Sequence, residues 1–295
     1  MRQDAREALA SALRRPRYEV IPLAGVADAV HEHVPRDLPL TVTSSPTKGI
    51  EATFQLTEQL RAGGFHVVPH LAARLVVDEA HLKDLLERLR EAGVREVFTV
   101  AGDVEEQAGV FPGSVELLET MAELDHDLSE IGIAGYPESH PFLDDDVTVQ
   151  AMWDKRRHAT YIVSQVCLDA DVLAAWVGRV RRRGVALPLH VGVVGAVDRV
   201  KLLRIATKVG LGESARYLRH HRGWLRRLLV PGGYRAQRFV EALAPDLADP
   251  AQRVVGFHVY TFNELEQTER WRRQILERLA DEASSPVHHR EGGAR

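Results

Sequence analysis

Cysteine is almost absent from this 295-residue sequence, with Cys167 as the one example. A single cysteine excludes an internal disulfide and a cysteine-based metal cluster. It suits a reducing compartment, so the expected location is the cytoplasm. Because its neighbours Val166 and Leu168 are apolar, we expect a buried, inert thiol and not a nucleophile.

Long apolar runs and strong net charge are also missing. No stretch approaches the roughly 20 apolar residues that a membrane-spanning helix needs, and the start MRQDAREALASALRR has no apolar core like that of a secretory signal. The net charge of -4 gives no electrostatic reason to expect nucleic acid or an anionic membrane as partner. A small-molecule partner is therefore expected, and the oligomeric state, including a homo-oligomer, is left open.

Two common functional motifs are absent as well. No Gly-x-Gly-x-x-Gly follows an expected strand, so a classical dinucleotide-binding domain is not supported. The histidines and acids form no HExxH or other closely spaced ligand set, so we expect no metal site.

The sequence does contain a regular alternation of short apolar runs with amphipathic helical runs, which is typical of parallel strands joined by helices. Helices are clearest at 78–92 and 171–183, each expected to start at an aspartate N-cap and to stop at a glycine, Gly93 or Gly184. Eight strands are predicted, at 18–22, 38–43, 66–70, 96–101, 130–136, 160–166, 187–194 and 254–260.

This pattern predicts an α/β fold, a (βα)8 TIM barrel, with extra helices in the seventh crossover. Those helices are expected at 199–208, 213–229 and 234–247. We expect one domain, with an N-terminal extension at 1–16, a catalytic barrel at 17–283 and a disordered tail at 284–295.

Polar residues gather where the predicted strands end, which is where (βα)8 barrels carry their active sites. A carboxylate inside strand one, Glu19, needs a reason. Catalysis is one reason, and an outward-pointing Glu19 or one paired with a basic residue is the alternative. The strand ends also supply Thr43, His70, Asp103, Tyr136, His140, Gln165 and Tyr260.

Each of these residues has a structural interpretation too. Asp103 after Gly102 is typical of a turn or helix cap. His70 is compatible with a satisfied core histidine, Gln165 with a backbone cap, and Tyr136 with packing at the barrel rim. Their coincidence at one end of one barrel is what favours a functional site.

In order and approximate spacing, these motifs resemble the methylenetetrahydrofolate reductase family of the bacterial type. The resemblance covers about Tyr18 to Ala280. Its most specific element is Ala134-Gly135-Tyr136-Pro137-Glu138 with His140-Pro141; the others are Tyr18-Glu19-Val20-Ile21-Pro22, Leu40-Thr41-Val42-Thr43, Pro69-His70-Leu71, Gly102-Asp103, Ser164-Gln165 with Asp169, and the run from Phe257 to Asn263.

The resemblance implies NAD(P)H-dependent reduction of 5,10-methylenetetrahydrofolate to 5-methyltetrahydrofolate through bound FAD. Glu19 would supply a proton during opening of the imidazolidine ring, and Asp103 would stabilise the iminium intermediate. Gln165 and Tyr260 would bind the substrate. FAD would be held by Thr43, His70, Gly102, Ala134, Tyr136, His140 and Lys155.

Several positions depart from the family pattern. Ala101 stands where the family has an arginine, the loop around Phe111 is shortened, and Thr148 and Ala151 replace an aspartate and an asparagine. We therefore expect weak FAD binding. The alternatives are direct, flavin-independent hydride transfer from NADH, oxidation of methyl-tetrahydrofolate in a demethylation pathway, and a non-catalytic barrel that binds folate or a partner.

Overall fold

The computed structural model describes residues 1–44, 48–102, 104, 106–138, 145–197 and 234–284. Eight parallel strands pair in chain order, and β8 closes the ring against β1. The strands are β1 (Arg17–Val20), β2 (Leu40–Val42), β3 (Val67–Ala72), β4 (Glu96–Val100), β5 (Glu130–Gly135), β6 (Tyr161–Ser164), β7 (Leu189–Val194) and β8 (Val254–Tyr260).

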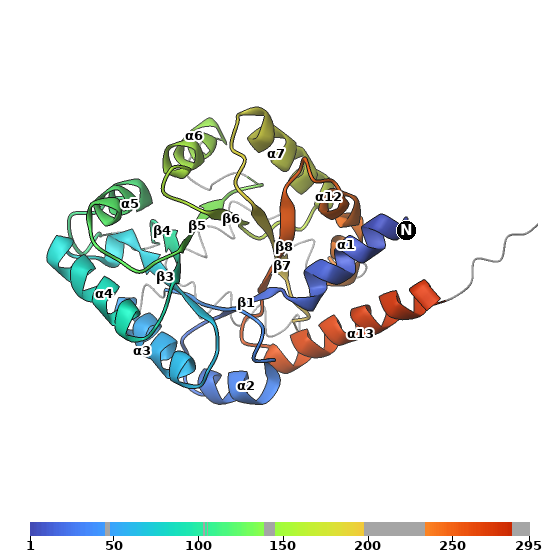
Figure 1. Cartoon of the computed structure of the whole chain (residues 1–295), viewed down its shortest axis with the longest axis horizontal. Coiled ribbons are helices and arrows are strands. Elements are labelled where there is room, and N and C mark those ends of the chain that lie inside the picture. The colour runs from blue at the N-terminus through green and yellow to red at the C-terminus, as the bar shows by residue number, and fades with distance from the viewer. Residues whose placement is uncertain (45–47, 103, 105, 139–144, 198–233, 285–295) are drawn as a thin grey trace, which may run out of the picture.

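Helices form the outer layer around this closed barrel (Figure 1). The expected (βα)8 fold is therefore confirmed. The helices are α1 (Gln3–Arg14), α2 (Val26–His33), α3 (Gly49–Ala62), α4 (Glu79–Glu91), α5 (Ser114–Glu123), α6 (Asp145–Lys155), α7 (Ala170–Arg182), α11 (Ala236–Ala242), α12 (Ala244–Ala248) and α13 (Leu265–Ser284), with a 3-10 turn at Ala73–Leu75.

The apolar stripes expected for two helices are buried against the barrel. In α4 the stripe is Leu82, Leu85, Leu86 and Leu89, and in α7 it is Leu173, Trp176, Val177 and Val180. Both helices end at glycines with left-handed backbone, as predicted. Asp78 caps α4, but α7 is capped by Asp169 and not by Asp171, because the Asp169 carboxylate accepts the free backbone N–H groups of Asp171 and Val172.

The segment between β7 and β8 carries more than one helix, as expected. The single helix predicted at 234–247 is in fact two short helices, α11 and α12. Pro245 in the first turn of α12 has no N–H to continue the preceding helix. The helices predicted at 199–208 and 213–229 lie outside the described residues.

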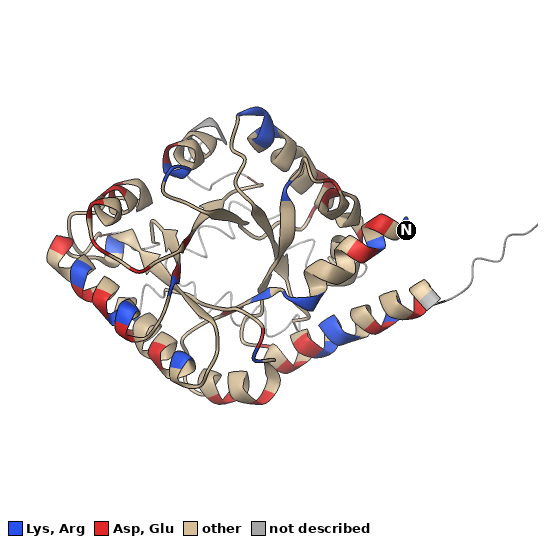
Figure 2. Cartoon of the chain, in the orientation of Figure 1, with Lys and Arg blue, Asp and Glu red and all other residues tan. Residues whose placement is uncertain are grey.

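The N-terminal segment packs against the barrel. Helix α1 contacts α12, α13 and β8, and Figure 1 shows it lying between α12 and α13. Leu9 and Leu13 of α1 are fully buried. Basic and acidic residues are interspersed along the ribbons of α4 and α13 (Figure 2). Among the described residues, no helix is both long and apolar enough to cross a membrane.

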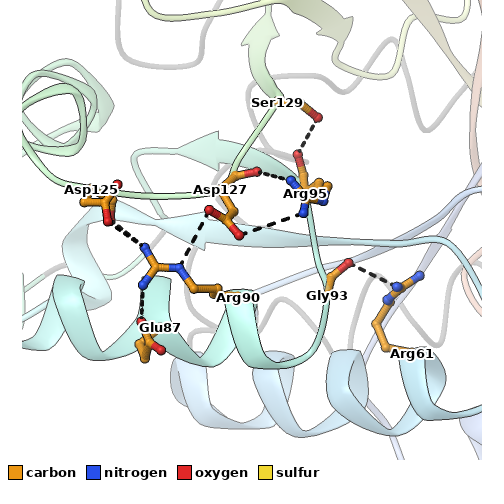
Figure 3. A network of polar contacts seen from close by, with 8 residues as sticks. All are labelled: Arg61, Glu87, Arg90, Gly93, Arg95, Asp125, Asp127 and Ser129. Atoms are coloured by element: carbon orange, nitrogen blue, oxygen red, sulfur yellow. Dashed lines mark hydrogen bonds and ion pairs between the residues drawn. The ribbon is translucent and has the colours of Figure 1, made fainter.

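Charged residues connect the elements around the N-terminal ends of β4 and β5 (Figure 3). Arg90 of α4 lies 2.7 Å from Glu87 and 3.2 Å from Asp125. The Ser129 hydroxyl donates to the carbonyl of Arg95 at 3.2 Å. These contacts tie the segments entering β4 and β5 to the helix layer, at the end of the barrel that usually serves stability.

Candidate active site

The eight strands are parallel, so their carboxyl ends meet at one end of the barrel. The structure brings most of the predicted residues to this end. Glu19 lies in β1, His70 in β3, Ala134 in β5 and Tyr260 at the end of β8, whereas Thr43, Gly102, Tyr136 and Gln165 follow β2, β4, β5 and β6. Asp103 and His140 lie outside the described residues.

Glu19 points into the barrel, where two histidines meet its carboxyl group. Its Oε2 lies 3.0 Å from Nε2 of His258 and 3.6 Å from Nε2 of His70. The Glu19 side chain is 14% exposed, against 11% for His70 and 1% for His258. Glu19 therefore does not point outward, and its contacts with two histidines match the alternative of a pairing with a basic residue.

Aromatic rings surround the two histidines. The Phe98 ring lies 4.9 Å from that of His70 and 6.4 Å from that of His258, and Tyr260 packs edge-on against His258 at 5.0 Å. Burial lowers the pKa of His70 to about 4, because an apolar setting disfavours the imidazolium ion. His70 is therefore neutral at pH 7.

The turn after β8 fixes the backbone around Glu19. The Thr261 hydroxyl donates to the Glu19 carbonyl at 2.5 Å. The Asn263 side chain accepts from the Ile21 N–H at 2.8 Å and donates to the Ile21 carbonyl at 2.9 Å. Phe262 and Asn263 both adopt left-handed backbone, with φ of 49° and 61°. Such strain persists where surrounding contacts hold it, often at functional sites.

Gln165 takes part in a junction between β5 and β6. Its backbone N–H donates to the Gly135 carbonyl at 2.7 Å, and its Oε1 accepts from the Val166 N–H at 2.9 Å. This is the backbone-capping role considered for Gln165 from the sequence. Glu138 extends the junction by accepting from the Leu168 N–H at 3.1 Å and the Cys167 thiol at 3.3 Å.

Cys167 is fully buried, as predicted. Burial raises the pKa of its thiol well above the ordinary value, so the thiolate is scarce at neutral pH.

The positions proposed for FAD divide into two groups. Among the described residues, Thr43, His70, Gly102, Ala134 and Tyr136 share the carboxyl end of the barrel with Glu19. Lys155 is the last residue of α6, and burial lowers the pKa of its ammonium group while Glu116 on α5 partly offsets that effect. Lys155 therefore has a carboxylate neighbour in the helix layer.

Sequence reasoning gave no role to His258, Thr261 or Asn263. Side chains alternate between the two faces of a strand, so His258 and Tyr260 lie on the same face of β8. This alternation could have indicated His258, because Tyr260 was already predicted to belong to the site. The contacts of Thr261 and Asn263 with β1 had no local signal, since they join residues 242 positions apart.

Comparison with known proteins decides the family. A family model described as methylenetetrahydrofolate reductase matches residues 27–212, more than half of the chain. The chain belongs to the methylenetetrahydrofolate reductase family. The match begins after Glu19 and ends before β8, so it includes neither Glu19 nor His258. The pairing of these two residues therefore rests on the distances given above.

Two curated relatives of this reductase family are fungal. The chain is 27% identical over 136 residues to methylenetetrahydrofolate reductase 2 of Saccharomyces cerevisiae, covering 42% of this chain and 23% of that protein. It is 31% identical over 119 residues to methylenetetrahydrofolate reductase 1 of Schizosaccharomyces pombe, covering 37% and 19%. The chain thus spans about a fifth of the length of these relatives.

A solved structure supports the fold. An uncharacterized protein from Clostridium thermocellum, which binds two copies of 5-methyl-5,6,7,8-tetrahydrofolic acid, aligns with a TM-score of 0.56. The alignment covers 92% of this chain and 97% of that chain, at 11% identity. At this identity the likeness shows a common barrel fold.

Proposed function

We propose that this reductase-family barrel reduces 5,10-methylenetetrahydrofolate to 5-methyltetrahydrofolate, with NADH or NADPH as hydride source. The observation that carries the proposal is the placement of Glu19. Its carboxyl group lies inside the functional end of the barrel, between two histidines, and is more exposed than either of them. A partly shielded carboxyl group with a hydrogen-bond partner, here His258, is suited to general acid catalysis.

In this proposal Glu19 donates a proton to the folate as the imidazolidine ring opens. The electron pair of the broken O–H bond stays on the carboxylate, which His258 continues to contact at 3.0 Å. Asp103 is proposed to stabilise the iminium cation that results, as a nearby carboxylate does for developing positive charge. Gln165 and Tyr260 are proposed to contact the pterin from β6 and β8.

FAD is the proposed hydride carrier, held weakly. A bound flavin would supply hydride transfer between the nicotinamide and the folate. Thr43, Gly102, Ala134 and Tyr136 fit such a site because they share the end of the barrel with Glu19, and His140 is proposed with them.

Direct hydride transfer from the nicotinamide is the second candidate. It is favoured by the surroundings of two proposed flavin residues: His70 lies 3.6 Å from Glu19, and the Glu116 carboxylate acts electrostatically on Lys155. Each charge-assisted hydrogen bond missing from a flavin site weakens binding by about 1.5 to 3 kcal/mol. Loss of two such bonds is enough to leave the protein without bound flavin when FAD is present at micromolar concentration.

Product analysis tests the proposed reaction. Purified protein is incubated with methylenetetrahydrofolate and nicotinamide nucleotide that carries deuterium at the transferable position, with and without added FAD. The expected result is 5-methyltetrahydrofolate, detected by mass spectrometry, with deuterium in its methyl group when transfer is direct. Absence of the methyl product under all these conditions would refute the proposed reaction.

A flavin titration separates the two hydride routes. Flavin-depleted protein is titrated with FAD by calorimetry, beside the Lys155→Met variant. Saturable binding supports the carrier route, and weakening in Lys155→Met assigns this residue to the flavin site. Absence of binding, together with turnover in flavin-free buffer, supports direct transfer.

A further inference from the structure

We infer that His258 is a positioning residue that decides which oxygen of Glu19 carries the transferable proton. The inference rests on the proposed function of Glu19 as an acid and adds a second residue to that step. It assigns the proton to Oε1 and makes Oε2 a permanent hydrogen-bond acceptor.

The geometry distinguishes the two oxygens of the carboxyl group. Oε2 faces Nε2 of His258 at 3.0 Å and Nε2 of His70 at 3.6 Å. Among the described residues, the one hydrogen bond between a histidine and the Glu19 carboxyl group goes to Oε2, and neither histidine forms one with Oε1. His258 itself is held on both sides, by Phe98 and by Tyr260, so its ring presents Nε2 to Glu19 in a fixed orientation.

The tautomer of His258 follows from its other nitrogen. Nδ1 of His258 is buried and has no hydrogen-bond partner among the described residues. A hydrogen on Nδ1 would be a buried donor without an acceptor, which is rare in folded proteins. A hydrogen on Nε2 is donated to Glu19 and leaves Nδ1 with only an unused lone pair. The Nε2–H tautomer is therefore the one that this environment favours.

An Nε2–H donor makes Oε2 the acceptor in both protonation states of Glu19. The acidic hydrogen must then sit on Oε1, on the oxygen that the histidines leave available. During the proton transfer the Oε1–H bond breaks, an N–H bond forms on the folate, and the electron pair remains on Glu19. The negative charge that develops spreads to Oε2, where the His258 donor is already in place.

Three variants of His258 test this role in the folate half-reaction. His258→Gln places its amide nitrogen at the reach of Nε2 and keeps a donor for Oε2. His258→Asn is the matched control, because its shorter amide ends near the position of Nδ1. His258→Leu removes the donor altogether.

We expect His258→Leu and His258→Asn to lower kcat for folate reduction by roughly tenfold or more. KM and the Kd for the nicotinamide nucleotide should change less than about threefold, because the effect is confined to the proton-transfer step. His258→Gln should recover kcat to within about threefold of wild type. If His258 had only a structural role, all three variants would lose thermal stability, and kcat per folded molecule would not separate His258→Gln from the other two. That result would overturn the inference.

Nitrogen NMR of histidine-labelled protein tests the tautomer without any folate. We expect His258 to show a protonated Nε2 and an unprotonated Nδ1 at pH 7. The opposite tautomer would overturn the inference even in an active enzyme. If wild-type protein forms no methyl-folate, the proposed function fails. The NMR result then still tests, independently, whether His258 donates a hydrogen bond from Nε2 to Glu19.

Discussion

The two ends of the barrel interior hold buried charges in different ways. At the N-terminal end, Arg17 forms a buried ion pair with Glu96, and His66 approaches Glu96 at 3.0 Å. The Arg17 guanidinium also lies 4.5 Å above the Tyr161 ring. At the carboxyl end, Glu19 meets two histidines, each with one buried ring nitrogen that makes no hydrogen bond among the described residues.

This difference is the one expected between a structural cluster and the proposed catalytic one. Glu96 has several partners, and although burial opposes ionisation, its contacts with His66, Arg17 and Tyr161 lower its pKa to about 2. Paired charges of this kind fix the barrel. Polar atoms left without partners cost stability, so the two beside Glu19 agree with the proposal of a site kept for chemistry.

Breaking the N-terminal cluster should have the largest effect on stability. Glu96→Gln leaves Arg17 buried without its main counter-charge, and we expect it to lower the free energy of unfolding by about 3 to 5 kcal/mol. Denaturant titration measures this loss. Folate reduction per folded molecule should stay within about threefold of wild type.

Glu130→Gln is the matched control for this prediction. Glu130 is 52% exposed and lies 3.8 Å from Arg17, so its loss should cost less than about 1 kcal/mol. Equal effects of the two variants would contradict the distinction between a buried structural pair and an exposed contact.

Acid should destabilise the barrel through histidines at both ends. Burial lowers the pKa of His190 to about 3 and that of His70 to about 4. The ordinary pKa of histidine is near 6.5, and folding lowers it at both positions. The folded state therefore keeps its full stability above about pH 6.5 and loses stability as pH falls from there toward the folded pKa. Between pH 7 and pH 5 each histidine should remove about 2 kcal/mol from the free energy of unfolding.

His190→Gln sharpens the acid prediction. The variant cannot take up a proton at this position, so its stability should fall by about 2 kcal/mol less than that of wild type over the same pH range. Denaturant titrations at pH 5 and pH 7 measure the difference. Identical pH dependence in both proteins would show that His190 does not drive the acid sensitivity.

The smallest expected effect concerns the turn that supports Glu19. Asn263→Gly keeps the left-handed backbone that glycine adopts readily but removes both side-chain hydrogen bonds to Ile21. We expect a loss of about 1 to 2 kcal/mol in unfolding free energy and a three- to tenfold drop, roughly, in folate reduction. A loss of stability with unchanged kcat would limit Asn263 to a structural role.

Much of this fold could be predicted from local patterns. The apolar strands and the leucine stripe of α4 carry their periodicity in the sequence, so the barrel followed from chain order. The N-cap of α7 was placed two residues late, because Asp169 and Asp171 are equally good caps and only the helical hydrogen bonds distinguish them.

The site was predictable only as a set of positions. Glu19 stood out because a carboxylate within an apolar strand is unusual. Its partners His258 and His70 could not be assigned, because they are 239 and 51 residues away in the chain and meet it only when the barrel closes. Burial of polar atoms, which distinguishes the two ends of the barrel, depends on that closure.

Glu19→Gln is the decisive test of the proposal that Glu19 supplies the proton for folate reduction. The glutamine keeps the shape of the side chain and can still hydrogen-bond His258, but it cannot act as an acid. In rapid-mixing experiments with methylenetetrahydrofolate, we expect its rate to fall by about a hundredfold or more, with nucleotide binding and the unfolding transition preserved. A Glu19→Gln rate within about threefold of wild type, a difference of only ~0.7 kcal/mol, would contradict the claim.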